Sequence, residues 1–302
     1  MSLVRRNDAL DINGFSNTVT TNNHITSRGS NWYFTVCALM SVSTLIFMGL
    51  SLRKPQSHRL FHYIAAAVAL VAAIAYFSMG SNLGWTAIQV EFRRRSPKVA
   101  GMMRQIFYVR YIDWFVTTPL LLLKLLLTCG MPTPTIVYTM LINEVMIVCG
   151  LVGALVKTSY KWGYFVFGCF AFFFVAYTVA FQGRSYACTL GQDISKIYTM
   201  AAIPIIAVWM LYPVAWGVCE GGNVIAPDSE AVFYGILDLT TKLLIPGLLI
   251  WNHRNIDLAR LGFHIRNVPE GGLPGSEKRG PHQQTGVAAP ATANTETPIN
   301  TV

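Results

Sequence analysis

The sequence predicts an all-α membrane protein built as a bundle of seven transmembrane helices. Of its 302 residues, 53% are hydrophobic and only 12% are charged, and this charged share is about half the one usual in soluble domains. Apolar runs recur along the chain at lengths near the roughly 20 residues that a helix needs to cross a bilayer. Most connections between the runs are short, which favours antiparallel neighbours in one compact bundle.

Seven apolar runs define the predicted spans. They cover residues 31–52, 60–83, 105–127, 133–156, 162–182, 197–219 and 231–251. Residues 1–30 lack the apolar core of a signal peptide, so the first run is expected to direct its own insertion. We expect a flexible N-terminal segment over 1–30 and one bundle domain over 31–265. Residues 266–302 are rich in Gly, Pro and Thr, which predicts a disordered tail.

The net charge of +9 does not indicate a nucleic-acid partner. The basic residues lie in segments that flank the apolar runs, as in "LRKPQSHR" and "FRRRSPK", where they can face headgroups and water. Their numbers on the two sides of the bundle nearly balance, so the positive-inside rule leaves the orientation open. The six cysteines form no CxxC pair, which favours buried free thiols over a metal site.

The run at 105–127 carries charges that a bilayer interior disfavours. An ionised side chain at the bilayer centre costs between about 3 and 17 kcal/mol, so such residues usually have a function. Helical spacing places Arg110, Asp113 and Thr117 on one face, and Lys124 lies about three turns beyond Asp113 on the same face. A structural Arg–Asp pair would account for the first two charges, but it leaves Lys124 without a partner.

The runs at 133–156 and 197–219 contribute small and aromatic residues. Trp209, Tyr212, Pro213 and Trp216 recur at spacings of three and four residues, which gives the sixth run one aromatic face. Gly150 in the fourth run would let a neighbour approach its helix closely. Ordinary helix packing explains either feature when it is taken alone.

The last run, "FYGILDLTTKLLIPGLLIW", places two charged side chains in the middle of the membrane. Asp238 and Lys242 lie one turn apart, so they face the same way. A buried lysine can act as a nucleophile and form an imine with a carbonyl compound. The cation of such an imine would need a counterion, and Asp113 and Asp238 are available. With Arg110 these groups sum to zero, as a site of low dielectric requires. The aromatic face beside them then becomes a slot for a flat conjugated ligand.

These residues resemble the microbial rhodopsins, seven-helix proteins that bind retinal, and within them the fungal branch related to proton pumps. The resemblance covers about residues 31–265. It rests on the motifs "YFSM", "RYIDWFVTTPLLLL", "WMLYPVAWG" and "EGGNVIAPDSEAVFYGILDLTTK", which occur in this order. It implies a seven-helix bundle with all-trans retinal in its core, and a transporter or photoreceptor rather than an enzyme.

The resemblance implies roles for residues of the third and seventh runs. Lys242 would carry retinal as a protonated Schiff base, Asp113 would be the main counterion and proton acceptor, and Asp238 the second counterion. Arg110 resembles the arginine below the counterions, and Thr117 the threonine bonded to Asp113. The residues implied to surround retinal or its counterions are Trp114, Thr118, Tyr76, Met146, Gly150, Trp209, Tyr212, Pro213 and Trp216.

Two glutamates after the sixth run, Glu220 and Glu230, resemble the pair that releases protons at the outer surface in this family. Two nearby carboxylates can share a proton and titrate together, although solvated loop glutamates are the alternative. The resemblance puts this loop and the N-terminus outside the plasma membrane. The expected partners are the lipid bilayer, protons and further copies of the chain in a homo-oligomer, for example a trimer.

Lys124 departs from the family pattern. Proton pumps of the family normally have at this position a carboxylic acid that returns a proton to the retinal site from the cytoplasm. Burial favours the neutral form of an amine, so Lys124 has no surplus proton but could capture one and pass it inwards. Alternatively, Lys124 slows this return and suits a photosensor, or it extends to water at the cytoplasmic end of its helix. The sequence leaves these three interpretations open.

Asp113 indicates which ion is moved. Chloride pumps of the family replace this carboxylate with a neutral residue, and sodium pumps need an Asn–Asp–Gln set that "YIDWFVTTPLLLLK" lacks. The sequence thus predicts a light-driven outward proton pump in which Lys124 assists reprotonation. The alternative is a photosensory receptor with a slow photocycle and little net transport.

Overall fold

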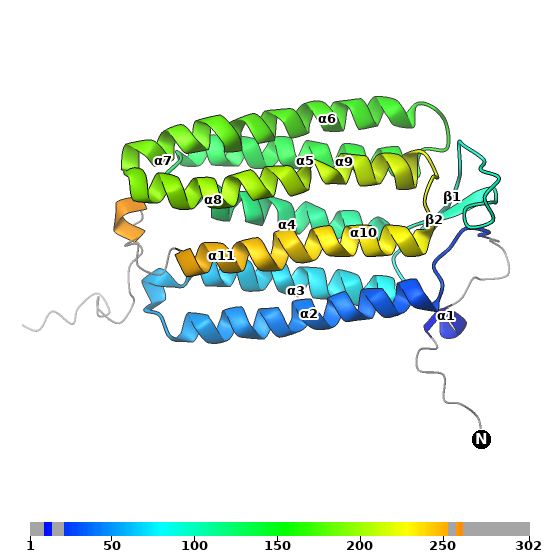
Figure 1. Cartoon of the computed structure of the whole chain (residues 1–302), viewed down its shortest axis with the longest axis horizontal. Coiled ribbons are helices and arrows are strands. Elements are labelled where there is room, and N and C mark those ends of the chain that lie inside the picture. The colour runs from blue at the N-terminus through cyan, green and yellow to red at the C-terminus, as the bar shows by residue number, and fades with distance from the viewer. Residues whose placement is uncertain (1–8, 14–20, 253–257, 262–302) are drawn as a thin grey trace, which may run out of the picture. The chain divides into compact units, whose positions relative to one another are not determined.

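The computed structural model describes residues 9–13, 21–252 and 258–261. Within them the chain forms a bundle of long helices with a small two-stranded sheet at one end (Figure 1). The predicted tail at 266–302 lies outside the described residues, and so do residues 1–8 and 14–20 of the predicted N-terminal segment.

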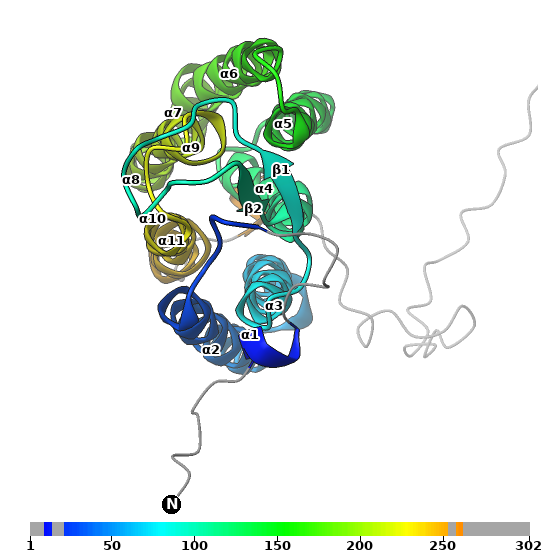
Figure 2. The same ribbon diagram turned by 90° about the vertical axis from the view of Figure 1, so that its right-hand side faces the viewer.

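Seven rods, counted within the described residues, make up the bundle, and each rod is one helix or a run of helices that continue one another. In chain order they are α2 (Ser27–Leu52), α3 (Leu60–Gly80), α4 (Tyr108–Leu127), α5 (Thr133–Leu155), α6 to α7 (Lys161–Leu190), α8 to η3 (Gln192–Gly221) and α10 to α11 (Pro227–Asn252). Consecutive rods lie side by side, and α10 returns to α2, which closes the ring seen end-on in Figure 2. Three short turns accompany them: α1 (Ala9–Ile12), η1 (Gln56–His58) and η5 (Leu258–Leu261).

Each of the last three rods is interrupted by a π-helical turn. Their parts are α6 (Lys161–Tyr177), η2 (Thr178–Gly183), α7 (Arg184–Leu190), α8 (Gln192–Trp209), α9 (Leu211–Trp216), η3 (Gly217–Gly221), α10 (Pro227–Leu239), η4 (Thr240–Leu244) and α11 (Ile245–Asn252). The turns η2, η3 and η4 are π-helical. Such turns are rare and often mark functional positions. Here η4 contains Lys242 and η3 contains Glu220.

Six of the seven rods are long and apolar enough to cross a membrane by length and composition. The remaining rod, α4, has 20 residues and includes Arg110, Asp113 and Lys124. These charged side chains are buried, whereas Ile112 and Phe115 on the same helix are exposed. Polar groups therefore face the interior and apolar groups face outward, as a bilayer requires. The predicted all-α, seven-helix membrane protein is confirmed.

A β-hairpin covers one end of the bundle. β1 (Thr86–Gln89) pairs antiparallel with β2 (Met103–Ile106) between α3 and α4. The backbone near Asn23 adds to this hairpin, because Asn23 N donates to the Met103 oxygen at 3.1 Å and Gln105 N donates to the Asn23 oxygen at 2.9 Å. We call this side of the bundle the hairpin end.

Three predicted span boundaries differ from the observed helices. The span predicted at 105–127 begins only at Tyr108, because the residues before it pair with β1. The span predicted at 162–182 continues to Leu190 through the π turn η2. The first span begins at Ser27 rather than at 31, and the Thr26 hydroxyl caps it by accepting a hydrogen bond from Arg28 N at 3.2 Å.

Candidate functional site

The amine of Lys242 lies between two carboxylates in the middle of the bundle. Lys242 Nζ donates to Asp113 Oδ2 from α4, and it donates to Asp238 Oδ2 from α10 at 3.2 Å. All three side chains are buried, with no more than 1% exposed. The structure thus brings together the lysine and both aspartates that the sequence spacing had placed on facing helices.

Asp238 is held in position by three further donors. Tyr76 OH donates to Asp238 Oδ2 at 2.8 Å. Tyr212 OH and Trp114 Nε1 donate to Asp238 Oδ1 at 2.6 and 3.3 Å. These donors come from α3, α9 and α4, so three rods fix one carboxylate. Buried polar groups need such partners, because an unpaired one costs several kcal/mol.

Asp113 has a different environment. Its Oδ2 bonds directly to Lys242 Nζ. Thr117, one turn further along α4, donates its hydroxyl to the backbone oxygen of Asp113 at 2.8 Å. Asp113 is therefore the carboxylate in closest contact with the amine, whereas Asp238 is the one that several neutral donors hold.

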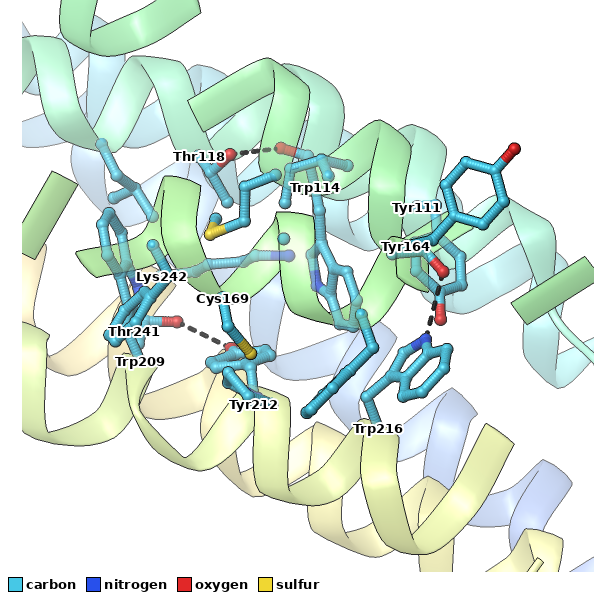
Figure 3. Close-up of a pocket in the computed structure, with 18 residues that line it drawn as sticks. Tyr111, Trp114, Thr118, Tyr164, Cys169, Trp209, Tyr212, Trp216, Thr241 and Lys242 are labelled. Carbon is cyan, nitrogen blue, oxygen red and sulfur yellow. Dashed lines mark hydrogen bonds between the residues drawn. The ribbon is translucent and has the colours of Figure 1, made fainter. Parts of the chain in front are cut away.

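The Lys242 side chain extends into an apolar pocket. Figure 3 shows it running toward Trp114, with Tyr212 and Trp216 on one side of the pocket and Thr118 on the other. The residues predicted to surround a ligand that do line this pocket are Trp114, Thr118, Met146, Gly150, Trp209, Tyr212, Pro213 and Trp216. The remaining one, Tyr76, contacts Asp238 instead.

The polar atoms in the pocket wall are already bonded within the protein. Trp216 Nε1 donates to the Gly150 oxygen at 3.1 Å, and Thr118 Oγ1 donates to the Trp114 oxygen at 2.8 Å (Figure 3). The Thr118 hydroxyl also accepts from Asn143 Nδ2 at 2.6 Å. What remains is an apolar, aromatic surface with one amine at its centre. This donor set fits a flat hydrocarbon chain with a carbonyl end, so the residues present fit retinal.

A second ionic cluster lies between Asp113 and the hairpin end. Arg110 Nη1 donates to Glu230 Oε1 at 2.6 Å and to Glu220 Oε1 at 3.2 Å. Arg110 Nη2 donates to Tyr33 OH at 2.9 Å. These ion-pair partners of Arg110 are glutamates, so the charge balance expected between Arg110 and the two aspartates extends outward to Glu220 and Glu230. The two glutamates are buried, with 4% and 2% exposed, and are not solvated loop residues.

Arg104, which the sequence did not single out, completes this cluster from β2. Its Nη2 donates to Glu230 Oε2 at 2.6 Å, and the side chain is only 1% exposed. Burial alone would lower the pKa of this guanidinium, but the neighbouring Glu230 carboxylate and the hydrogen bond between them hold the pKa above its usual range. Arg104 is therefore a fixed cation.

Lys124 lies in α4 beyond Asp113, on the side away from the hairpin end. Its Nζ donates to the backbone oxygen of Pro246 in α11 at 2.9 Å, and its side chain is 1% exposed. Leu121, Leu125 and Leu249 belong to the apolar cluster around this part of the bundle. The amine does not reach the surface, so the interpretation in which it extends to water is not supported.

Several site residues were missed because they look like ordinary packing residues in the sequence. Tyr111 and Tyr234 lie in apolar spans, where a tyrosine usually contributes only its ring. In the structure both phenols donate to Glu220. The α6 wall of the pocket was missed for the same reason; it contributes Tyr164, Phe165, Gly168, Cys169 and Phe172.

Fold and site together define a seven-helix membrane protein with one reactive lysine between two aspartates at the edge of an aromatic pocket. Comparison with known families agrees, because a family model described as bacteriorhodopsin-like protein matches residues 28–256. The chain belongs to this family, and the resemblance to microbial rhodopsins is confirmed. The opsin-like protein carO of Fusarium fujikuroi is 58% identical over 267 residues, which cover 88% of this chain and 87% of that protein.

Solved structures of rhodopsins share the fold. The light-driven proton pump rhodopsin CsR of Coccomyxa subellipsoidea is 34% identical with a TM-score of 0.72, over 76% of this chain and 99% of that one. The light-driven proton pump LR (Mac) of Leptosphaeria maculans is 30% identical with a TM-score of 0.73, over 78% of this chain and 99% of that one.

Proposed function

We propose that this protein is a light-driven outward proton pump. The observation that carries the proposal is the buried contact of Lys242 Nζ with Asp113 and Asp238 at the edge of an apolar pocket. Retinal bound to Lys242 Nζ as a Schiff base would supply light absorption and an isomerisation that redirects the proton on this nitrogen. The two solved proton pumps of similar sequence support this assignment.

Asp113 is the proton acceptor in this proposal. Its Oδ2 is in direct contact with Lys242 Nζ, and a proton carrier must be within hydrogen-bond reach of the atom that gives up the proton. Asp238 remains the counter-charge, because Tyr76 and Tyr212 hold it in position. A carboxylate acceptor also favours protons over chloride as the transported ion.

The outward path continues through Arg110. Arg110 lies one turn before Asp113 on α4 and bonds both glutamates, so neutralising Asp113 changes the charge balance that Arg110 experiences. Glu220 and Glu230 then release a proton at the hairpin end. We assign this end and the N-terminus to the outside of the plasma membrane, following the resemblance to the family.

Lys124 would assist the return of a proton from the cytoplasm. Its amine is buried in α4 on the side of Asp113 away from the hairpin end, and its one hydrogen-bonded acceptor printed by the geometry is a backbone oxygen. A neutral buried amine can bind a proton and pass it on. This differs from a carboxylic acid, which starts the cycle with the proton already bound.

The test is light-driven acidification. Intact cells that express the protein are supplied with all-trans retinal and illuminated, while the external pH is recorded. A fall in pH that an uncoupler abolishes supports outward pumping, and Asp113→Asn should remove it. A rise in pH, or no change while the visible band is present, would contradict the proposal.

A photosensory receptor is the second candidate, and the lysine at position 124 favours it. Without an acid at this position, reprotonation becomes slow and a long-lived photoproduct accumulates. The same recording separates the two candidates, because a sensor gives full visible absorption and slow recovery with little net acidification.

A further inference from the structure

The two glutamates of the outer cluster have different partners. Both oxygens of Glu230 accept from guanidinium groups, Oε1 from Arg110 Nη1 and Oε2 from Arg104 Nη2, each at 2.6 Å. Hydrogen bonds between ionised groups are shorter and roughly twice as strong as neutral ones. Glu230 thus has one charged donor on each oxygen.

Glu220 has mainly neutral partners. It shares Arg110 Nη1 with Glu230, but at the longer distance of 3.2 Å. Tyr111 OH donates to Glu220 Oε1 at 3.1 Å, and Tyr234 OH donates to Glu220 Oε2 at 3.0 Å. Phenols therefore supply two of its three donors.

This difference determines which carboxyl can hold a proton. A guanidinium has only N–H donors and no acceptor. A proton on Glu230 would point at a donor and would remove a charge-assisted hydrogen bond. A tyrosine hydroxyl both donates and accepts, so a protonated Glu220 can turn one of its bonds around and donate to Tyr111 or Tyr234.

Arg104 is itself held rigidly, so its effect on Glu230 is permanent. Its Nη1 donates to Asn223 Oδ1 at 2.7 Å and to the Ile225 oxygen at 2.9 Å. Asn23 Nδ2 donates to the same Asn223 oxygen at 2.8 Å. The guanidinium is thereby fixed between the hairpin and the loop before α10.

The other titratable groups around the pair do not reverse this asymmetry. Lys161 Nζ, from α6, contacts the backbone oxygen of Glu220 at 3.3 Å rather than its carboxylate. Tyr33, from α2, bonds only to the far nitrogen of Arg110. Cys219 Sγ lies within 4.8 Å of the glutamate oxygens, but a thiol is a weak donor that adds no charge.

We infer that Arg104 keeps Glu230 a permanent anion, so that Glu220 alone carries the proton that leaves at the hairpin end. The proton is then localised on one carboxyl and is not shared by the pair. The inference deepens the proposed function and rests on it for the direction of transport. Arg104 is a positioning residue, because it acts through Glu230 and does not touch the proton.

Infrared difference spectra of the full-length protein in nanodiscs test this in the dark, as the buffer is stepped across neutral pH. We expect a discrete C=O band from a protonated carboxyl in the wild type, and Glu220→Gln should remove it. Arg104→Gln should replace it with the broad continuum absorption of a proton shared by two carboxyls. Arg104→Lys keeps the charge and should restore the discrete band, and Arg93→Gln, at an exposed position of the same hairpin loop, should leave it unchanged.

Three results would overturn the inference: a continuum in the wild type, a discrete band that survives Glu220→Gln, or an Arg104→Gln spectrum identical to the wild type. If Arg104→Gln does not fold, the wild type and Glu220→Gln alone still decide. The dark measurement does not depend on transport. A protein that fails to acidify the medium would therefore refute the proposed function and leave this result intact.

Discussion

Lys124 Nζ donates to the backbone oxygen of Pro246 at 2.9 Å, which joins the third rod to the seventh on the side of Asp113 away from the hairpin end. Pro246 follows the π turn that carries Lys242 by two residues. The amine at position 124 is thus connected through the backbone to the segment that holds the reactive lysine. It is placed to exchange a proton toward the centre of the bundle, and its own acceptor carries no charge.

Lys124→Asp should accelerate the recovery of the resting visible spectrum after a flash. A buried carboxyl is held protonated and can donate at once, whereas a neutral amine must first capture a proton. General acids contribute about 10²- to 10⁴-fold to proton-transfer rates, so a gain of about ten-fold or more is expected. Time-resolved absorption at the maximum of the resting band measures it.

Lys124→Leu is the matched control for a relay. It removes the amine and keeps an apolar side chain in the surrounding leucine cluster, so recovery should slow and added azide, a soluble proton carrier, should restore it. Flash kinetics equal to the wild type in both variants would show that this side chain has no part in reprotonation.

Lys242→Ala should give a colourless protein when all-trans retinal is added. The variant lacks the amine that would bind the ligand, and it leaves Asp113 and Asp238 buried without their cation. Removing one partner of a buried ion pair typically costs about 3–5 kcal/mol, so thermal stability should also fall. Leu244→Ala, at an exposed position of the same π turn, should form the pigment normally. Visible absorption retained in Lys242→Ala would contradict the assignment of the site.

Tyr212→Phe should weaken the site without removing the pigment. It deletes the 2.6 Å hydrogen bond to Asp238 Oδ1 and leaves that oxygen with only the longer bond from Trp114. Losing one donor to a buried carboxylate costs about 1–3 kcal/mol. The visible band should shift and the pigment should bleach at a lower temperature than the wild type. Tyr164→Phe, in the same pocket but 38% exposed, is the control and should change neither property.

The fold and the centre of the site could be predicted because membrane burial makes charges conspicuous. Lys242, Asp238 and Asp113 stand out in apolar runs, and helical spacing alone orients them toward a common interior. The π turns could not be predicted in this way, since nothing in "TTKLL" distinguishes a π turn from an α-helix. The helix start at Tyr108 was also hidden, because the strand before it is as apolar as a helix would be.

The outer cluster was only partly predictable. Glu220 and Glu230 came from the resemblance, but Arg104 looked like one more basic residue in a loop that contains several. Its role depends on the β2 strand, which turns the side chain inward, and on Asn223 some 120 residues later in the chain, at a hydrogen-bond separation of 119. Such long-range contacts leave no periodic signal in a single sequence. A charged residue flanked by apolar ones, as in "GMMRQIF", is the clue that could have indicated it.

Gly150→Leu should hinder the binding of retinal while preserving the helix. A Cβ at Gly150 would lie 3.3 Å from Tyr111 Cε1, so a larger side chain has to extend into the pocket that Gly150 lines. Leucine is a better helix former than glycine by about 1 kcal/mol, so α5 itself should not be weakened. Gly163→Leu brings the same change in helix propensity to α6, where nothing lies within 4 Å of the added Cβ, and it isolates the steric effect. The rate and extent of visible band formation after adding retinal to the ligand-free protein measure the result. Gly150→Leu should bind more slowly and less completely than Gly163→Leu. Equal pigment formation in the two variants would mean that the ligand does not occupy the space beside Gly150, and the pocket assignment would then be wrong.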